Sequence, residues 1–192
     1  MMNDIILETE HLVLRPFSES DFGAVQSYAG NIENVEYMIW GPNNEEDTKD
    51  FIDTTNQEAK KNPRKNYDFA ITLKDTKQLI GGGGIYLNDE LNQATVGWVL
   101  HLDYWKNGYG SEFAAALLKF GFEELNLHRI WATCNTENYG SYRIMERNGM
   151  RREAHFIKCR FGRVCDSEVW YDEYHYGILA EEWRERNGGM KN

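Results

Sequence analysis

Alternation of apolar and polar residues predicts a series of short strands along the chain. Residues 12–17 predict the first strand and residues 67–73 a longer one, which returns as a third strand over residues 78–87. The returning strand contains Gly81–Gly84. Glycines inside a strand usually mark a bulge or a close backbone approach, so we expect one of these there. Further strands are expected at residues 95–100, at residues 129–134 and, as two or more segments, within residues 150–179.

Apolar residues at every third or fourth position predict the helices. The strongest pattern covers residues 112–125, where Phe113, Leu117, Phe120 and Leu125 form one stripe for burial. Other helices are expected after the cap-like residues 18–21, at residues 45–61, at residues 138–148 before Gly149, and within the charged residues 181–192.

The order of these elements predicts the fold class. Helices and antiparallel strands come first, followed by a strand–loop–helix–strand–helix unit and the closing strands. Such an order is typical of an α+β (mixed α/β) protein in which helices cover a single sheet. The 192 residues show no repeat and no low-complexity linker, which favours one domain over residues 1–180 and a charged C-terminal tail over residues 181–192.

Charge and cysteine content narrow the class of function. The formal net charge is −10, so a nucleic acid backbone would repel the chain, whereas a cationic amine would be attracted. The three cysteines lack a zinc-ligand spacing, so we expect no metal site. We find neither a signal-peptide pattern nor an apolar run of membrane-spanning length. These features favour a cytoplasmic protein with free thiols that binds neither nucleic acid nor membrane.

A glycine-containing loop, Gly108-Tyr109-Gly110-Ser111, precedes the strongest helix. The first amides of a helix lack internal partners, and glycines leave them accessible, so such a loop suits a pyrophosphate. A P-loop would need Gly-Lys-Ser/Thr, and a dinucleotide fingerprint would need a small residue at Phe113, so both patterns fail. A coenzyme A loop fits, although the loop taken alone is equally consistent with a plain tight turn.

The residues around this loop resemble a known family. Residues 97–112 resemble the acetyl-coenzyme A motif of the GNAT superfamily of N-acetyltransferases, and residues 135–150 are similar to its second coenzyme motif. The spacing of Asn138 and Ser141 resembles the ribosomal-protein N-terminal acetyltransferases, the Rim-type branch. Residues 9–16 and 170–179 resemble the opening and closing strands of that branch, so the resemblance spans nearly the whole chain.

The resemblance implies a GNAT fold with one strongly twisted mixed sheet, whose strands near residues 95–100 and 129–134 splay apart. It also implies a place for the cosubstrate acetyl-CoA. The pantetheine arm would pair with the backbone of Val99 and Leu100, and Asn135 and Asn138 belong to the motif that holds the coenzyme from the next helix. The pyrophosphate would meet the loop formed by Lys106, Asn107, Gly108, Tyr109, Gly110 and Ser111.

The implied reaction is direct attack of a neutral amine on the thioester within a ternary complex. Many relatives protonate the leaving thiolate with a Tyr, where this chain has Met145, so the resemblance suggests Ser141 as the acid; a helix-capping role is equally open. His101 titrates in the range of a base, but it also fits a packed residue, and water-relayed loss of the proton to Asp or Glu stays open. Thr95 stands where relatives often carry a Glu. Cys134 is expected to be a small buried apolar residue.

Three functions remain at this stage. The first is acetyl transfer to a primary amine, foremost a protein N-terminal amine. The second is acetyl transfer to a polyamine or another small amine, and the third is an acyl-CoA-binding module without turnover. A homodimer formed by edge pairing of the closing strand is a further prediction.

Overall fold

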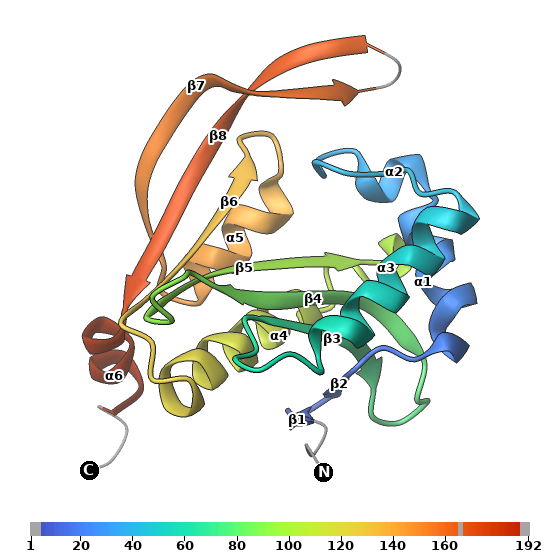
Figure 1. Ribbon diagram of the computed structural model, residues 1–192. Coiled ribbons are helices and arrows are strands. Elements are labelled where there is room, and N and C mark those ends of the chain that lie inside the picture. Colours follow the sequence, from blue (N-terminus) through green and yellow to red (C-terminus); the bar gives the residue numbers. More distant parts are fainter. Residues whose placement is uncertain (1–4, 165–166, 189–192) are drawn as a thin grey trace.

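A single mixed sheet runs through the part of the chain that the computed structural model describes, residues 5–164 and 167–188. The strands follow the order β1-β2-β3-β4-β5-β6-β8-β7 (Figure 1). Their bounds are β1 Leu7–Glu8, β2 Leu12–Arg15, β3 Asn66–Leu73, β4 Leu79–Leu87, β5 Gln93–Leu100, β6 Arg129–Asn135, β7 Arg151–Val164 and β8 Ser167–Leu179. All neighbouring pairs are antiparallel except β5 and β6.

Helices pack on both faces of this sheet. Their bounds are α1 Phe22–Ala29, α2 Ile32–Val35, α3 Glu45–Glu58, α4 Tyr109–Lys119, α5 Tyr139–Arg147 and α6 Ala180–Gly188, and a π-helical turn at Phe120–Glu124 continues α4. A single sheet flanked by helices confirms the predicted α+β fold class.

The glycine run of β4 separates two cores. A Cβ at Gly83 would lie 2.7 Å from the Phe113 ring on α4, whereas a Cβ at Gly82 would lie 2.7 Å from Phe17 and 3.1 Å from the Tyr28 hydroxyl on α1. Neighbouring strand residues point to opposite faces, so α4 covers one face of β4 and α1 the other. The larger core lies on the α4 face, and the smaller one, with Val25 and Ile52, lies under α1 and α3.

Both features expected of the glycine run are present. The register between β3 and β4 shifts at Ile71 and Thr72, which pair with Gly81 and Leu79 and leave Ile80 unmatched. The short distances from Gly82 and Gly83 show the close approach. The prediction for Gly81–Gly84 is therefore confirmed.

β5 and β6 diverge after a short parallel contact. Gln93, Ala94 and Thr95 pair with residues 129–131, and beyond them the two strands share no pairing. β6 continues along β8 instead, up to the pair Asn135 and Glu173. The splayed strands implied by the resemblance are present.

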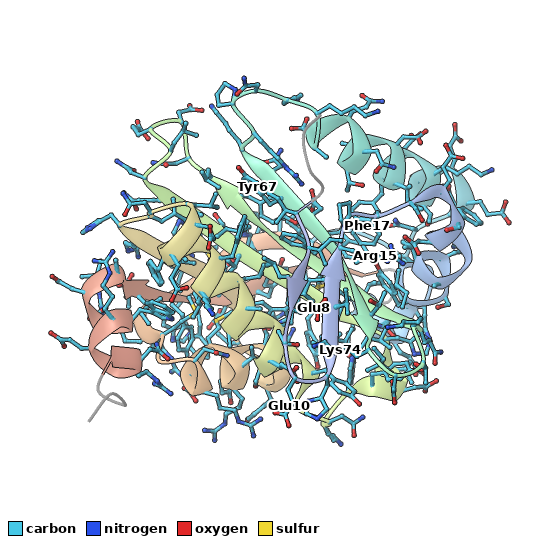
Figure 2. The ribbon with its side chains drawn as sticks, turned by 90° about the horizontal axis from the view of Figure 1, so that it is seen from below. Glu8, Glu10, Arg15, Phe17, Tyr67 and Lys74 are labelled. Atoms are coloured by element: carbon cyan, nitrogen blue, oxygen red, sulfur yellow. The ribbon has the colours of Figure 1, made fainter. Side chains whose placement is uncertain are left out.

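The closing hairpin, β7 with β8, extends beyond the rest of the sheet (Figure 1). β8 lies between β6 and β7, so the predicted edge pairing of the closing strand is wrong: both sides of β8 are already paired. β7 forms this edge of the sheet and β1 the other. Lys74 and Glu8 meet beside β1, with Nζ and Oε2 3.2 Å apart (Figure 2).

α6 packs against the π-helical turn. The Trp183 and Phe122 rings lie 5.4 Å apart, and Arg186 donates a hydrogen bond to the Arg147 carbonyl. The end of the predicted tail, residues 189–192, lies outside the described residues. Among the described residues, no helix combines the length and the apolar character needed to cross a membrane.

Candidate functional site

The loop before α4 presents a set of unpaired amides. Gly108 is the N-cap of α4, and its φ of +88° is one that side chains other than glycine rarely adopt. The first helical hydrogen bond runs from the Glu112 amide to the Gly108 carbonyl. Among the described residues, the amides from Lys106 to Ser111 donate no hydrogen bond to the protein. These amides lie at the positive end of the helix dipole, which suits an anion.

Each loop residue has a different surrounding. Lys106, Asn107 and Gly108 are exposed, whereas Gly110 is buried because α5 packs against it: a Cβ there would lie 2.6 Å from Ile144 Cδ1. The Ser111 hydroxyl is buried and, among the described residues, is the one buried side-chain polar atom without a hydrogen-bond partner. An unpartnered hydroxyl at an anion-binding helix end has a donor to offer a ligand.

The register of β5 decides which backbone groups face the gap toward β6. The His101 amide donates to Ile80 of β4, and Val99 pairs with Gly82. Backbone groups alternate in direction along a strand, so those of Val99 point into the sheet, and those of Trp98 and Leu100 point into the gap. Of the two predicted pantetheine contacts, the structure therefore directs Leu100 to the gap and Val99 to β4.

Two side chains donate hydrogen bonds to the Leu100 carbonyl oxygen. Asn34 Nδ2 lies 2.6 Å from this oxygen, and Trp105 Nε1 lies 2.8 Å from it. Asn34 also accepts a hydrogen bond of 2.8 Å from the Leu102 amide. These contacts tie α2 to the end of β5. Sequence analysis missed Asn34, because nothing local marks a contact between residues so far apart in the chain.

The asparagines of the second motif hold local backbone. Asn138 is the N-cap of α5 and accepts a hydrogen bond of 3.0 Å from the Ser141 amide, and Asn135 accepts one of 2.9 Å from the Glu137 amide. Among the described residues, neither side-chain NH₂ group donates a hydrogen bond. Both NH₂ groups therefore remain available as donors, and Asn135 also lines the cavity described below.

Ser141 lies on the first turn of α5 beside Cys134. Burial raises the pKa of the Cys134 thiol to about 12, and the Ser141 hydroxyl, which hydrogen-bonds the thiol, opposes that rise. The thiol therefore stays protonated at neutral pH and is no nucleophile. Met145, at the position of the Tyr in many relatives, is buried in the main core.

His101 lies at the end of β5, where its Nδ1 accepts a hydrogen bond of 3.3 Å from the Asp103 amide. Its ring packs edge-on against Tyr104 at 6.2 Å. His101 is not among the residues that line the large cavity described next. The structure thus places the predicted base in a turn, and neither His101 nor Ser141 is among the residues that line that cavity.

A cavity of about 900 Å³ lies on the α1 and α3 face of the sheet and reaches the gap between β5 and β6. Residues 96–99 of β5 and 133–135 of β6 form its floor, the loop at residues 37–43 one wall, and the β7–β8 hairpin another. Its carboxylates are Asp47, Asp50, Asp68 and Glu173. Aromatic side chains, among them Trp40, Tyr86 and Tyr171, line the rest.

Two of these carboxylates are held by hydrogen bonds. The buried Glu173 lies 2.9 Å from Arg160 Nε and 2.7 Å from His175 Nε2, so its charge is paired. The Tyr86 hydroxyl donates a hydrogen bond of 2.7 Å to Asp68 Oδ1. Burial raises the pKa of Asp68, while Tyr86 and Arg64 oppose the rise. Asp68 therefore holds a proton more readily than an ordinary aspartate.

Comparison with known proteins identifies the family. Residues 11–151 match the family model of the acetyltransferase (GNAT) domain. The chain is 40% identical over 177 residues to the uncharacterized N-acetyltransferase YnaD of Bacillus subtilis (strain 168), covering 92% of this chain and 98% of that protein. This chain is a member of the GNAT acetyltransferase family.

Solved structures agree with this membership. An acetyltransferase (GNAT family) from Bacillus anthracis superposes with a TM-score of 0.80 at 37% identity, over 92% of this chain and 99% of that one. A spermidine N-acetyltransferase from Vibrio cholerae, solved with CoA and spermine, gives a TM-score of 0.77 at 19% identity, over 91% of this chain and 99% of that one, and shows the shared fold.

This acetyltransferase depends on acetyl-CoA, as its family does. The residues present fit the cosubstrate: the amides at residues 106–111 and the orphan Ser111 hydroxyl suit a pyrophosphate. Trp98, whose backbone groups face the gap between β5 and β6, also lines the cavity. Sequence analysis found the loop by its glycines, but it missed Asp68, whose position depends on strand register.

Proposed function

We propose that this acetyltransferase transfers the acetyl group of acetyl-CoA to a protein N-terminal amine, by direct attack within a ternary complex. The observation that carries the proposal is the cavity lined by the diverging parts of both β5 and β6. A thioester carried along the gap would emerge there beside carboxylates that attract an ammonium group. The spacing of Asn138 and Ser141, with Met145 in place of a Tyr, supports the Rim-type acceptor.

In this proposal the coenzyme lies along three features. Its pyrophosphate meets the amides of residues 106–111, its arm lies along Trp98 and Leu100, and Asn135 and Asn138 donate from the side of α5. Ser141 protonates the leaving thiolate. His101 is poorly placed to act as the base, because its side chain caps a turn and does not line the cavity.

A polyamine is the second candidate acceptor. Asp47, Asp50 and Asp68 line one cavity, and several carboxylates suit a substrate with more than one ammonium group. The net charge of −10 favours the same class by steering cations toward the protein.

A panel of acceptors distinguishes the two classes. Free coenzyme A thiol is measured with short peptides that carry a free N-terminus, with the same peptides N-terminally blocked, and with spermidine. We expect thiol release with the free peptides alone. Release with spermidine and not with peptides would replace the first proposal by the second, and release with no amine would overturn both.

Assembly and cellular location belong to the same proposal. We place the enzyme in the reducing cytoplasm, where Cys134 and Cys159 stay free thiols. We also propose a homodimer, formed through the edge strand β7, where Phe156 and Ile157 are exposed. Light scattering should give twice the chain mass, and Ile157→Asp should give the mass of one chain. A wild-type monomer at assay concentration contradicts the dimer.

A further inference from the structure

The half-buried carboxylate of Asp68 has no role in the arrangement described so far. Asp68 lies on β3 and lines the cavity, on the face of the sheet covered by α1 and α3. Its direct partner across the strands is Gly84, which has no side chain to cover it. The Asp68 carboxylate therefore lines the cavity without a side chain directly opposite it on β4.

Tyr86 holds this carboxylate from the next strand. Tyr86 follows Gly84 by two positions on β4, so both residues belong to one sheet face. A Cβ at Gly84 would lie 2.8 Å from the Tyr86 hydroxyl oxygen, so the phenol lies over the position that a larger residue would fill. Glycine at this position lets the Tyr86 hydroxyl reach Asp68 Oδ1 at 2.7 Å.

The Asp68–Tyr86 pair lies beside Thr95, a cavity residue that cannot act as a base. Tyr86 pairs directly with Thr95 on β5, which is the position where relatives often carry a Glu. Thr95 cannot take a proton at neutral pH, and His101 lies outside the cavity. Asp68 on β3, with Tyr86 on β4, thus supplies an ionisable group to the cavity that Thr95 on β5 also lines.

We propose that Asp68 is the general base that takes the proton from the acceptor's ammonium group, and that Tyr86 is the positioning residue that aims it. The proposal rests on the proposed function, because it needs an amine acceptor in the cavity. It holds for a peptide N-terminus and for a polyamine alike.

The proton balance is complete. The ammonium group gives one proton to the Asp68 carboxylate and becomes a neutral amine. The amine nitrogen forms a bond to the thioester carbonyl carbon, the carbon–sulfur bond breaks, and the thiolate takes up the second nitrogen-bound proton through Ser141. Asp68 then returns its proton to water. The products are the acetylated amine, coenzyme A and one proton.

Several ionisable groups surround Asp68 and set its titration. Tyr86 faces it from β4, Tyr28 from α1 and Glu58 from the end of α3, and Arg64 acts from the segment before β3. Burial and Glu58 favour the protonated acid, whereas the Tyr86 hydroxyl and Arg64 favour the carboxylate. A base of this kind loses activity as the pH falls through its own pKa.

The test measures kcat/KM against pH with the best acceptor from the panel. We expect Asp68→Asn to lose about 10²- to 10⁴-fold in kcat/KM, the usual effect of losing a general base. Asp68→Glu, which keeps a carboxylate, should recover part of the loss. Tyr86→Phe removes the hydrogen bond that favours the Asp68 carboxylate. The acid limb of the kcat/KM profile of this variant should therefore lie at higher pH than that of the wild type.

A matched variant controls for the change of charge. Asp53→Asn removes one carboxylate from the exposed face of α3 and should leave both kcat/KM and the pH profile unchanged. Calorimetric titration with coenzyme A should give the wild-type Kd for Asp68→Asn, which shows that the fold and the coenzyme site persist.

Two results overturn the inference. The first is an Asp68→Asn enzyme with the wild-type kcat/KM and acid limb. The second, which applies even if Asp68→Asn does not fold, is a Tyr86→Phe profile with an unmoved acid limb. A wild-type enzyme that acetylates no amine would instead contradict the proposed function. Failure of the base assignment and failure of the proposed function are therefore distinguishable.

Discussion

Two serines of this acetyltransferase, one in each coenzyme motif, have opposite surroundings. The Ser111 hydroxyl is buried at the start of α4 without a partner among the described residues, whereas Ser141 contacts the Cys134 thiol. A buried hydroxyl without a partner costs folding free energy, and a ligand that accepts its hydrogen bond would offset this cost. Ser141, in contrast, already has a local contact, so only kinetics can reveal a catalytic role.

Ser111→Ala should separate folding from binding. Removing an unpartnered buried hydroxyl should leave the free energy of unfolding unchanged or raise it by about 1 kcal/mol. The Kd for coenzyme A should rise about tenfold, the effect of losing a hydrogen bond of roughly 1.4 kcal/mol to a charged group. Urea unfolding and calorimetry give the two numbers. An unchanged Kd would mean that the hydroxyl does not meet the coenzyme.

Ser141→Ala tests the proposed acid. We expect kcat to fall by about 10²- to 10⁴-fold while the Kd for coenzyme A stays close to that of the wild type. Ser27→Ala, on the exposed side of α1, is the matched control. Full acetyl transfer by Ser141→Ala would show that another group protonates the thiolate.

At the scale of elements, α4 and α5 pack together, and we propose that they bind the coenzyme as one unit. Gly110 lets α5 approach α4, and Asn148 Nδ2 reaches the Ser111 carbonyl at 3.2 Å. Asn138 caps α5 with its side-chain oxygen and leaves its NH₂ group available. In the proposed function, one side chain therefore combines a structural role and a binding role.

Asn138→Asp and Asn138→Ala should separate these two roles. Aspartate caps a helix as well as asparagine does, so Asn138→Asp should keep the wild-type stability, whereas Asn138→Ala should lose about 1 kcal/mol. Both variants lack the NH₂ donor, so both should bind coenzyme A more weakly. Thermal unfolding and calorimetry provide the comparison. If Asn138→Asp binds as tightly as the wild type, Asn138 is a cap alone.

At the scale of the whole molecule, an ion pair that ties the sheet to the helix following it makes stability depend on pH. Arg15 on β2 forms two hydrogen bonds of 2.7 Å with Asp21 at the start of α1. Burial opposes ionisation of Asp21, but the Arg15 guanidinium and the Ser18 amide outweigh it and lower the pKa of this carboxyl.

Acid should therefore weaken the fold through Asp21. A carboxyl whose pKa is lower in the folded state stabilises it above the unfolded pKa, near 3.8, and this contribution disappears as the pH falls through the folded value. Urea unfolding from neutral pH to about pH 3 should show the decline, and Asp21→Asn should show a smaller one. Equal slopes for both proteins would exclude Asp21 as a source.

Local signals were sufficient for much of this molecule. The helix predicted at residues 45–61 is observed as Glu45–Glu58, and the one at residues 138–148 as Tyr139–Arg147. The helix predicted from residue 112 begins earlier, at Tyr109, because Gly108 provides the N-cap. Periodicity, caps and glycine loops act between neighbours in the chain, so the sequence by itself determined these elements and the glycine loop before α4.

Other features depend on contacts between distant residues. The register with β4 decides that the backbone groups of Trp98, and not those of Val99, face the gap between β5 and β6. The contact between Asp68 and Tyr86 depends on strand register and on the absence of a side chain at Gly84. His101 has the chemistry of a base, yet its position in a turn keeps it out of the cavity. Strand pairing and packing bring together residues that no local pattern connects, and for this reason only the tertiary structure decided which groups meet in the active site.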